Sequence, residues 1–367
     1  MKVGIVTAPL DFGPSGPGVY LQNLCLQLTE LDGVDLHCIH YRESENPIYD
    51  RATEVRLSRT IGQFEWEISK LNLDVLHYNY VPWKRPLVFG LDVTHVITIH
   101  GDLPFVLPEF APWHRRYIDV PIQKLYSKIG LLDQVDTFVA VSETVASNFA
   151  SALDIPASKF RTVYSGVDKQ FKPIDGAAST VASKFDICPP YLLNVNNYME
   201  KKNRETLLRS FVEIREQWPD LNLVLAGGSW EESAIPSLIN RLGLDDCVVD
   251  LGFVANEDLP LLYSGATAFI NPTLHETFGF TNLEAMACGC PVVTSNRFAV
   301  PEIVGNGAKL VSDPLCPDAV ATATNELLTD ETARTALAER GRKQANKYSW
   351  ERTAEEVLDV YRETLSQ

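Results

Sequence analysis

The feature that most constrains the fold is an alternation of short β-branched runs with longer helical patterns, which occurs twice along the chain. In the first half the predicted strands cover residues 3–7, 36–41, 75–78, 95–99 and 137–141, and residues 19–31 have helical periodicity. In the second half the predicted strands cover 191–195, 221–226, 247–253, 268–271 and 291–295, with helices over 204–218, 234–242 and 281–288. Such alternation predicts parallel sheets with crossover helices. We therefore expect two α/β domains.

The length of 367 residues agrees with two domains, because single hydrophobic cores stop growing at about 250–300 residues. A small-residue stretch at 175–179 lies between the two series of strands and is typical of a linker, so we place the domain boundary near residue 173. We place one Rossmann-like domain at 1–172 and a second Rossmann-like domain at 173–349. A closing helix at 350–367 completes the chain. Further helices are expected over residues 318–328, 331–347 and 351–365.

Acidic side chains dominate the composition, with 48 aspartates and glutamates against 32 lysines and arginines and a formal net charge of −16. The resulting field repels phosphate backbones, so we expect no nucleic-acid partner. Residues 113–129 are a local exception, because basic side chains there are interleaved with aromatic and apolar ones. This stretch is either an ordinary surface helix or a contact with a membrane surface or an anionic acceptor.

The location of the protein is predicted from its cysteines and its apolar segments. The seven cysteines lie mostly in apolar runs, which is typical of buried thiols in a reducing compartment. The apolar run at residues 1–7 is too short for a signal peptide and reads as a strand. An apolar stretch of about 18 residues, the length that spans a bilayer, does not occur. We expect a cytoplasmic protein, with peripheral contact at the inner membrane face if residues 113–129 bind lipid.

The strongest local signal is a strand, loop and helix between residues 268 and 288. Gly279 allows close approach to the backbone, and the amides of Phe280, Thr281 and Asn282 are expected to point outward from the start of the helix. A helix N-terminus carries partial positive charge and binds phosphate. A diphosphate is therefore the expected ligand of this turn.

Glu276 and Glu284 flank that phosphate position, one in the loop and one expected in the first turn of the helix. Carboxylates accept hydrogen bonds from paired hydroxyls, so one suits a sugar and the other a ribose diol. An alternative for Glu284 is structural, because Thr281-Asn-Leu-Glu284 also fits a helix capping box.

The segment Glu276-Thr-Phe-Gly-Phe-Thr-Asn-Leu-Glu284-Ala-Met-Ala-Cys-Gly-Cys-Pro291 resembles the E-x7-E signature of retaining glycosyltransferases of family 4. The match includes the pair Phe278-Gly279 and the Pro-Val-Val strand that follows. The resemblance implies a GT-B fold, with two facing Rossmann-like domains, parallel sheets and a deep interdomain cleft. It implies that the domain at 1–172 binds the acceptor, that the domain at 173–349 binds the nucleotide sugar, and that the helix at 350–367 packs back on the N-terminal domain. It also implies that Glu276 contacts the transferred sugar, that Glu284 binds the ribose, and that the loop amides hold phosphate or sugar hydroxyls.

The resemblance extends to the first strand of the second domain, where the family usually has Gly-Arg and a lysine five positions after the arginine. Lys202 matches that lysine, and Asn197 stands at the arginine position. We expect the charge of the leaving group to rest on Lys202 and the helix terminus, unless Lys201 or Arg204 reaches it. Without the resemblance, Lys202 reads as a solvated lysine at a helix start.

Three further segments match the family. His100 ends a strand and corresponds to a histidine that hydrogen-bonds the donor sugar. Gly16 and Gly18 belong to a glycine-rich loop, residues 13–18, that closes over donor and acceptor, and Phe253 and Val254 lie where the main chain meets the base. The glycine-rich loop lacks the G-x-G-x-x-G pattern, so a dinucleotide site is not expected.

The resulting hypothesis is retaining transfer of a hexose or N-acetylhexosamine from a UDP- or GDP-sugar to a glycan or lipid-linked acceptor, with His100, Lys202 and Glu276 as catalytic residues. Because D-x-D occurs nowhere in the sequence, we expect neither a metal nor another cofactor. Front-face attack needs no protein nucleophile. The alternatives are an epimerase or phosphorylase on the same fold, and a carbohydrate-binding or scaffold subunit without turnover. The donor base, the sugar and the acceptor stay open.

Overall fold

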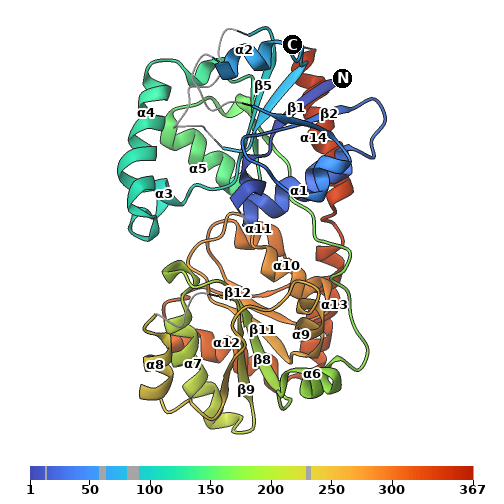
Figure 1. Ribbon diagram of the computed structural model, residues 1–367. Helices are drawn as coiled ribbons and strands as arrows, with labels where there is room; N and C mark the ends of the chain where they lie inside the picture. The colour runs from blue at the N-terminus through green and yellow to red at the C-terminus, as the bar shows by residue number, and fades with distance from the viewer. Residues whose placement is uncertain (13–14, 58–62, 81–90, 229–232, 367) are drawn as a thin grey trace. The chain divides into compact units, whose positions relative to one another are not determined.

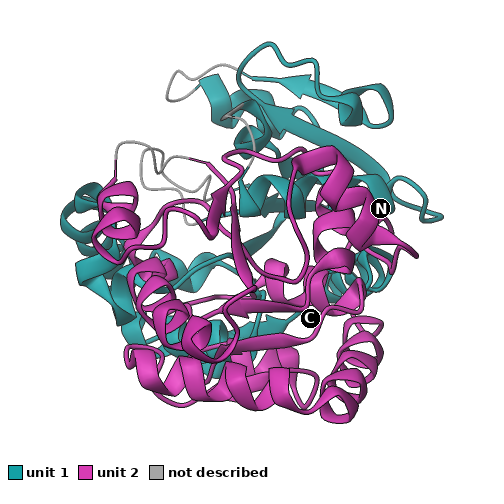
Figure 2. Cartoon of the chain, turned by 90° about the horizontal axis from the view of Figure 1, so that it is seen from below, with its two compact units in different colours: residues 1–166, 349–367 teal, residues 167–348 magenta. Residues whose placement is uncertain are grey.

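The computed structural model describes residues 1–12, 15–57, 63–80, 91–228 and 233–366. The chain divides into two compact units (Figure 2). The first unit consists of Met1–Gly166 and Ser349–Gln367, and the second consists of Val167–Tyr348. At Gly166 a Cβ would lie only 2.2 Å from the backbone nitrogen of Trp350. The backbone therefore needs a glycine where the chain leaves the first unit and passes the start of its returning helix.

The first unit is built on a seven-stranded parallel sheet with the strand order β3-β2-β1-β4-β5-β6-β7 (Figure 1). The strands are β1 Lys2–Val6, β2 Asp35–His40, β3 Thr53–Arg56, β4 Val75–Tyr78, β5 Thr94–Ile99, β6 Thr137–Ala140 and β7 Phe160–Thr162. The first strand lies inside the sheet and the chain winds outward in both directions, which is the Rossmann arrangement.

The main helices of this unit are α1 Gly16–Leu28, α2 Gln63–Ser69, α3 Leu103–Val106, α4 Val120–Lys128, α5 Glu143–Leu153 and α14 Trp350–Leu365. A π-helical turn, Arg115–Asp119, leads into α4. Helix α14 packs against α1, β5 and β6. The Tyr361 hydroxyl lies 2.5 Å from Nδ1 of His77 in β4, and both side chains are fully buried. The returning helix is thus part of the core of the first unit.

The second unit contains a six-stranded parallel sheet with the order β10-β9-β8-β11-β12-β13. Its strands are β8 Tyr191–Val195, β9 Asn222–Ala226, β10 Val248–Asp250, β11 Ala268–Asn271, β12 Val292–Ser295 and β13 Lys309–Val311. Its helices are α6 Ala177–Phe185, α7 Arg204–Gln217, α8 Ile235–Arg241, α9 Leu259–Gly265, α10 Phe280–Ala287, α11 Val300–Val304, α12 Pro317–Thr329 and α13 Glu331–Ala345. The prediction of two parallel-sheet, Rossmann-like units is confirmed.

In each sheet the strand order reverses at one point, between β1 and β4 and between β8 and β11. Every residue of β8 and β11 is buried, as expected for central parallel strands covered on both faces. Ligands of such sheets bind beyond the carboxyl ends of the strands at the reversal point. The segments that follow β8 and β11 are therefore the first place to look for a site in the second unit.

Several element boundaries differ from the sequence prediction. Strands β3, β7 and β13 were not predicted, because they are only three or four residues long and lack a continuous apolar run. The strand expected over 247–253 is limited to Val248–Asp250, since Gly252 has φ +59° and leaves the extended conformation. The helix expected over 19–31 begins at Gly16 and ends at Leu28, because the Ser15 hydroxyl accepts from the Gly18 amide and caps it.

Candidate functional site

Two loops meet at the carboxyl ends of β8 and β11. The loop after β8 passes Asn196 and Asn197 and forms a short 3-10 turn, Glu200–Lys202, before α7 begins. The amide of Leu274 donates to the carbonyl of Lys201 at 2.7 Å, and Nδ2 of Asn203 donates to the carbonyl of Pro272 at 2.9 Å. These bonds hold the lysine-bearing turn against the loop that follows β11.

This attachment brings Lys202 and Glu276 together. Lys202 Nζ lies 2.6 Å from Glu276 Oε1, and the two side chains are only 15% and 9% exposed. Burial on its own raises the pKa of Glu276, but the charge of Lys202, with smaller contributions from Lys201 and His275, brings that pKa below its ordinary value. Glu276 is therefore ionised at neutral pH, and its carboxylate can accept hydrogen bonds from hydroxyl groups.

Helix α10 begins directly after this carboxylate. Gly279 is its N-cap residue and has φ +91°, a conformation that residues with a side chain adopt only at a cost. The helix starts at Phe280, one residue earlier than predicted. The prediction of an outward-pointing amide at Asn282 is wrong, because that amide donates to the carbonyl of Gly279 at 3.1 Å. The positive end of the helix is thus made by the residues from Gly279 to Thr281.

Glu284 lies in the second turn of α10 rather than the first. The Tyr263 hydroxyl in α9 donates to Glu284 Oε2 at 3.0 Å. The capping box with Thr281 is absent from the described helix, because Gly279 and not Thr281 occupies the N-cap position. The pKa of Glu284 is raised to about 7, mainly because the carboxyl is buried; the hydrogen bond from Tyr263 opposes this rise, and the charge of Asp168 adds to it. Sequence reasoning missed Tyr263, which sits in an apolar helical stretch without any distinguishing motif.

The other predicted donor-binding residues of the second unit occupy different environments. Phe278 is a core residue, 3% exposed, with its ring centroid 5.8 Å from that of Tyr348. Asn197 is exposed beyond β8, and Phe253, beyond β10, is 78% exposed beside the half-buried Val254. Phe253 therefore presents a large apolar ring at the same edge of the sheet.

Arg204 does not extend outward as the sequence allowed. Its side chain is buried under the ends of β8 and β9, where the guanidinium donates to the carbonyls of Asn196 and Ala226. Backbone packing here is tight, because a Cβ on Gly227 would lie 2.1 Å from the carbonyl oxygen of Asn196. Arg204 therefore holds the backbone at the ends of these strands, and its guanidinium does not reach the protein surface.

In the first unit, His100 follows β5 and its Nε2 lies 3.4 Å from Oδ1 of Asn79, which follows β4. The Tyr20 ring packs edge-on at 4.7 Å between centroids. Burial lowers the pKa of His100 to about 3, so its imidazole is neutral. Gly16 and Gly18 belong to the first turn of α1 and not to a loop; residues 13 and 14 of the predicted loop lie outside the described residues.

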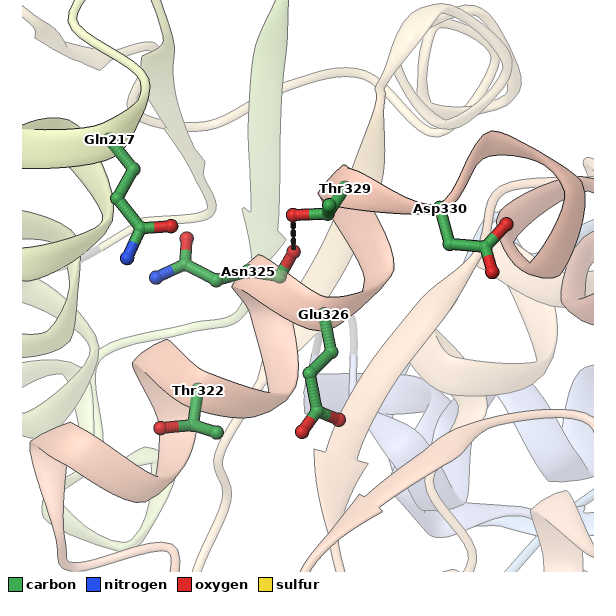
Figure 3. A pocket seen from close by; sticks show the side chains of 6 residues that line it. All are labelled: Gln217, Thr322, Asn325, Glu326, Thr329 and Asp330. Carbon is green, nitrogen blue, oxygen red and sulfur yellow. Dashed lines mark hydrogen bonds between the residues drawn. The ribbon is translucent and has the colours of Figure 1, made fainter.

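A shallow hollow of about 440 Å³ in the second unit contains none of these residues. It is lined by Gln217, Thr322, Asn325, Glu326, Thr329 and Asp330 (Figure 3). Gln217 ends α7, which starts beyond β8 and returns to the opposite edge of the sheet. The two carboxylates in the lining would repel an anionic ligand such as a diphosphate. We therefore identify the candidate site from the side chains around Lys202 and Glu276, and not from the size of a hollow. Among the described residues, no cluster of three or more His, Cys, Asp or Glu side chains is arranged to hold a metal ion.

Comparison with known proteins gives the family. The family described as Glycosyltransferase Family 4 matches residues 14–171, and the family described as Glycosyl transferases group 1 matches residues 182–344. O-antigen chain mannosyltransferase B of Escherichia coli is 31% identical over 275 residues, which cover 73% of this chain and 70% of that protein. The chain belongs to the family 4 glycosyltransferases.

Solved structures agree with this assignment at the level of the fold. Sucrose-phosphate synthase from Thermosynechococcus elongatus aligns with a TM-score of 0.81 at 21% identity and covers 100% of this glycosyltransferase and 99% of that chain. Anabaena HepE in complex with UDP-glucose aligns with a TM-score of 0.79 at 16% identity, over 98% of this chain and 99% of the other. The GT-B prediction is confirmed. No helix in the described ranges of this glycosyltransferase is long and apolar enough to cross a membrane.

Proposed function

We propose that this glycosyltransferase moves a hexose or N-acetylhexosamine from a UDP- or GDP-sugar to a glycan or lipid-linked acceptor, with retention and without a metal. The observation that carries the proposal is the buried Lys202–Glu276 pair beside the N-terminus of α10, at the point where the strand order of the second sheet reverses. The name of the Escherichia coli relative, a mannosyltransferase, supports a hexose. The UDP-glucose complex of HepE supports a nucleotide-linked donor.

In this proposal the diphosphate lies against the N-terminus of α10 and accepts a hydrogen bond from Lys202. An ammonium group has three donors, so Lys202 can retain its bond to Glu276 while a second N–H serves a phosphate oxygen. Glu276, ionised by the same neighbour, accepts hydrogen bonds from the hydroxyls of the sugar. Donors fixed in advance around a developing anion stabilise its charge without reorganisation, and a single such donor contributes about 3–4 kcal/mol.

The nucleoside is assigned to the neighbouring residues. Glu284 accepts from the ribose diol, Tyr263 orients the carboxylate, and Phe253 and Val254 lie near the base. In the first unit, neutral His100 donates a hydrogen bond to the sugar, and the first turn of α1 with Gly16 and Gly18 contacts donor and acceptor. Transfer breaks the bond between the anomeric carbon and the phosphate oxygen and forms the bond to the acceptor oxygen. The acceptor proton passes to the leaving phosphate.

Contact with an anionic membrane is a second part of the proposal, motivated by the surface around α4. Trp113, Tyr117, Leu125 and Ile129 are 69%, 64%, 52% and 62% exposed. Basic side chains lie among them in the sequence, at positions 115, 116, 124 and 128. Exposed aromatic rings beside cationic side chains suit the headgroup region of anionic lipid. In a chain of net charge −16, this surface gives the protein a local attraction to such a membrane.

The test is a panel of UDP- and GDP-linked hexoses and N-acetylhexosamines, read by thermal shift and by release of the nucleoside diphosphate with a glycan or lipid-linked acceptor. We expect one donor to raise the melting temperature and to be consumed without added metal and with EDTA present. Wild-type protein stabilised by no donor in the panel would contradict the proposal. Stabilisation without turnover for any acceptor would favour the non-catalytic carbohydrate-binding subunit.

A further inference from the structure

A chain of buried side-chain hydrogen bonds connects Arg204 with the first turn of α10. Arg204 Nε donates to Oδ1 of Asn194 at 3.3 Å. Asn196 Nδ2 donates to Oδ1 of Asn194 at 3.4 Å and to Oδ1 of Asn271 at 3.2 Å. Asn271 Nδ2 then donates to Oδ1 of Asn282 at 3.0 Å. The chain thus passes from α7 across the ends of β8 and β11 to α10.

All members of this chain are removed from solvent. Asn194, Asn271 and Asn282 are fully buried, Asn196 is 5% exposed and Arg204 is 3% exposed. Burying an amide is costly unless its donors and acceptors are paired, and apolar side chains could fill the same space without that requirement. Four asparagines in one small region, next to the candidate diphosphate position, therefore point to a role in ligand binding.

The hydrogen bonds define which end of each amide faces the site. Asn271 has its Nδ2 toward Asn282, so Asn282 must present its oxygen to Asn271 and its nitrogen to the opposite side. That nitrogen lies 3.3 Å from the position of a Cβ on Gly279, beside the N-cap of α10. Within the part of the chain that the structure describes, Asn282 Nδ2 is buried and has no hydrogen-bond partner. The series of hydrogen bonds therefore begins at the guanidinium of Arg204 and ends at the unused N–H donor of Asn282, beside the turn at Gly279.

We propose that this series of hydrogen-bonded asparagines positions the diphosphate of the donor, and that it supplies an N–H donor to the phosphates where Asn197 stands in place of the arginine. The proposal rests on the proposed function and deepens it by assigning roles to Arg204, Asn271 and Asn282. Arg204 fixes the orientation of the amides, and Asn282 holds the turn at Gly279 with its N–H directed toward negative charge. Arg204 and Asn271 are positioning residues, because they act through the strand ends and through Asn282, whose N–H faces the diphosphate.

The test compares the affinities of nucleoside diphosphate and monophosphate, measured by titration calorimetry with UDP and UMP and with GDP and GMP. The wild type will select either the uridine or the guanosine pair. Within that pair, the dissociation constant of the monophosphate divided by that of the diphosphate measures how strongly the protein recognises the second phosphate. For Asn282→Leu, which has the same branching but is apolar, we expect the diphosphate to bind at least tenfold more weakly and the monophosphate to change less than twofold. A general loosening of the fold would weaken both ligands alike.

Asn282→Asp provides a second variant that keeps an acceptor for Asn271 and suits a helix N-terminus. It replaces the N–H with negative charge, so we expect an equal or larger loss confined to the diphosphate. Arg204→Met should reduce the ratio, and Arg204→Lys should restore part of it because the charge is kept. Ser210→Ala, which removes a buried hydroxyl bonded to the carbonyl of Leu207 in α7, is the matched control and should leave the ratio unchanged.

A wild-type ratio in both Asn282 variants, or an equal loss of both ligands, would overturn the role of the chain while leaving the proposed function intact. Failure of the wild type to bind either diphosphate would instead overturn the proposed function, and the role of the chain with it.

Discussion

Nζ of Lys202 and Oε1 of Glu276 are 2.6 Å apart in a setting where each side chain is at most 15% exposed. The two residues are far apart in the sequence and meet only because the loops after β8 and β11 are bonded to each other. A close, buried ion pair depends on both partners, since removing one leaves an uncompensated charge. A comparison of single and double variants can therefore distinguish the contribution of the pair to stability from its contribution to catalysis.

For the single variants Lys202→Met and Glu276→Gln, we expect a loss of about 3–5 kcal/mol in the free energy of unfolding, measured by urea denaturation, and turnover below detection. The double variant should recover much of the stability and none of the turnover. Lys184→Met, which breaks an exposed pair with Asp258, should cost less than about 1 kcal/mol. Full activity in either single variant would exclude a role in transfer.

The raised pKa of Glu284 predicts that the stability of the protein depends on pH. Its pKa is about 7 in the folded protein, against 4.5 for an ordinary glutamate, so the folded state retains a proton that the unfolded state releases. Stability of the wild type therefore falls as the pH rises from about 4.5 to above 7. Glu284→Gln lacks this loss, so its stability relative to the wild type should improve by about 1–3 kcal/mol between pH 5 and pH 8.

Urea denaturation of both proteins at several pH values measures that difference. Glu339→Gln, on an exposed position of α13, is the control and should follow the wild type. If Glu284 binds ribose, Glu284→Gln should also weaken nucleoside diphosphate binding at pH 8, where the wild-type carboxylate is ionised. A stability difference that does not vary with pH would show that Glu284 titrates at an ordinary pKa.

Gly279→Ala should lower activity more than stability. The φ of +91° is strained for alanine, at a cost of about 1–2 kcal/mol, and the added methyl group would lie 3.3 Å from Asn282 Nδ2. Gly243→Ala imposes similar strain, with φ +67°, where nothing lies within 4 Å. The two variants should melt at similar temperatures, and only Gly279→Ala should lose donor turnover. Equal turnover in both would argue against a close approach of ligand at Gly279.

The surface around α4 can be tested with sedimentation of vesicles. Trp113→Ser should reduce binding to phosphatidylglycerol vesicles severalfold, because burying an indole ring in the interface is a major part of the attraction. Trp66→Ser is the matched control, since Trp66 is 57% exposed outside this surface. Wild-type binding should weaken with salt and be absent for neutral phosphatidylcholine vesicles. Salt-insensitive or absent binding of the wild type would contradict a lipid contact.

Much of the fold was predictable because its signals are local. The strands β8 and β11 are mostly apolar, with one asparagine each, and the sequence Pro272–Gly279 between β11 and α10 carries recognisable turn and phosphate-binding chemistry. The edge strands β3, β7 and β13 were missed, since pairing with a neighbour, rather than their own composition, makes them strands.

The contacts of the site were harder to predict than its members. Glu276 and Lys202 could be named from the sequence, but their ion pair depends on bonds between two loops. Tyr263 and Asn271 were missed because neither side chain differs in sequence from an ordinary core or turn residue. Only the packing of α9 on α10, and of β11 beside β8, shows what they contact.

The hydrogen bond between His77 and Tyr361 has a consequence for biogenesis. Helix α14 is translated after the entire second unit, although it fills the core of the first. On the ribosome, the first sheet therefore emerges with the binding surface for α14 uncovered, while the contiguous second unit can close as soon as it is complete. Chaperones that recognise apolar surface would therefore have longer to bind the first unit than the second. A chain that ends before Trp350 would leave the α14-binding surface of the first unit permanently uncovered and open to proteolysis.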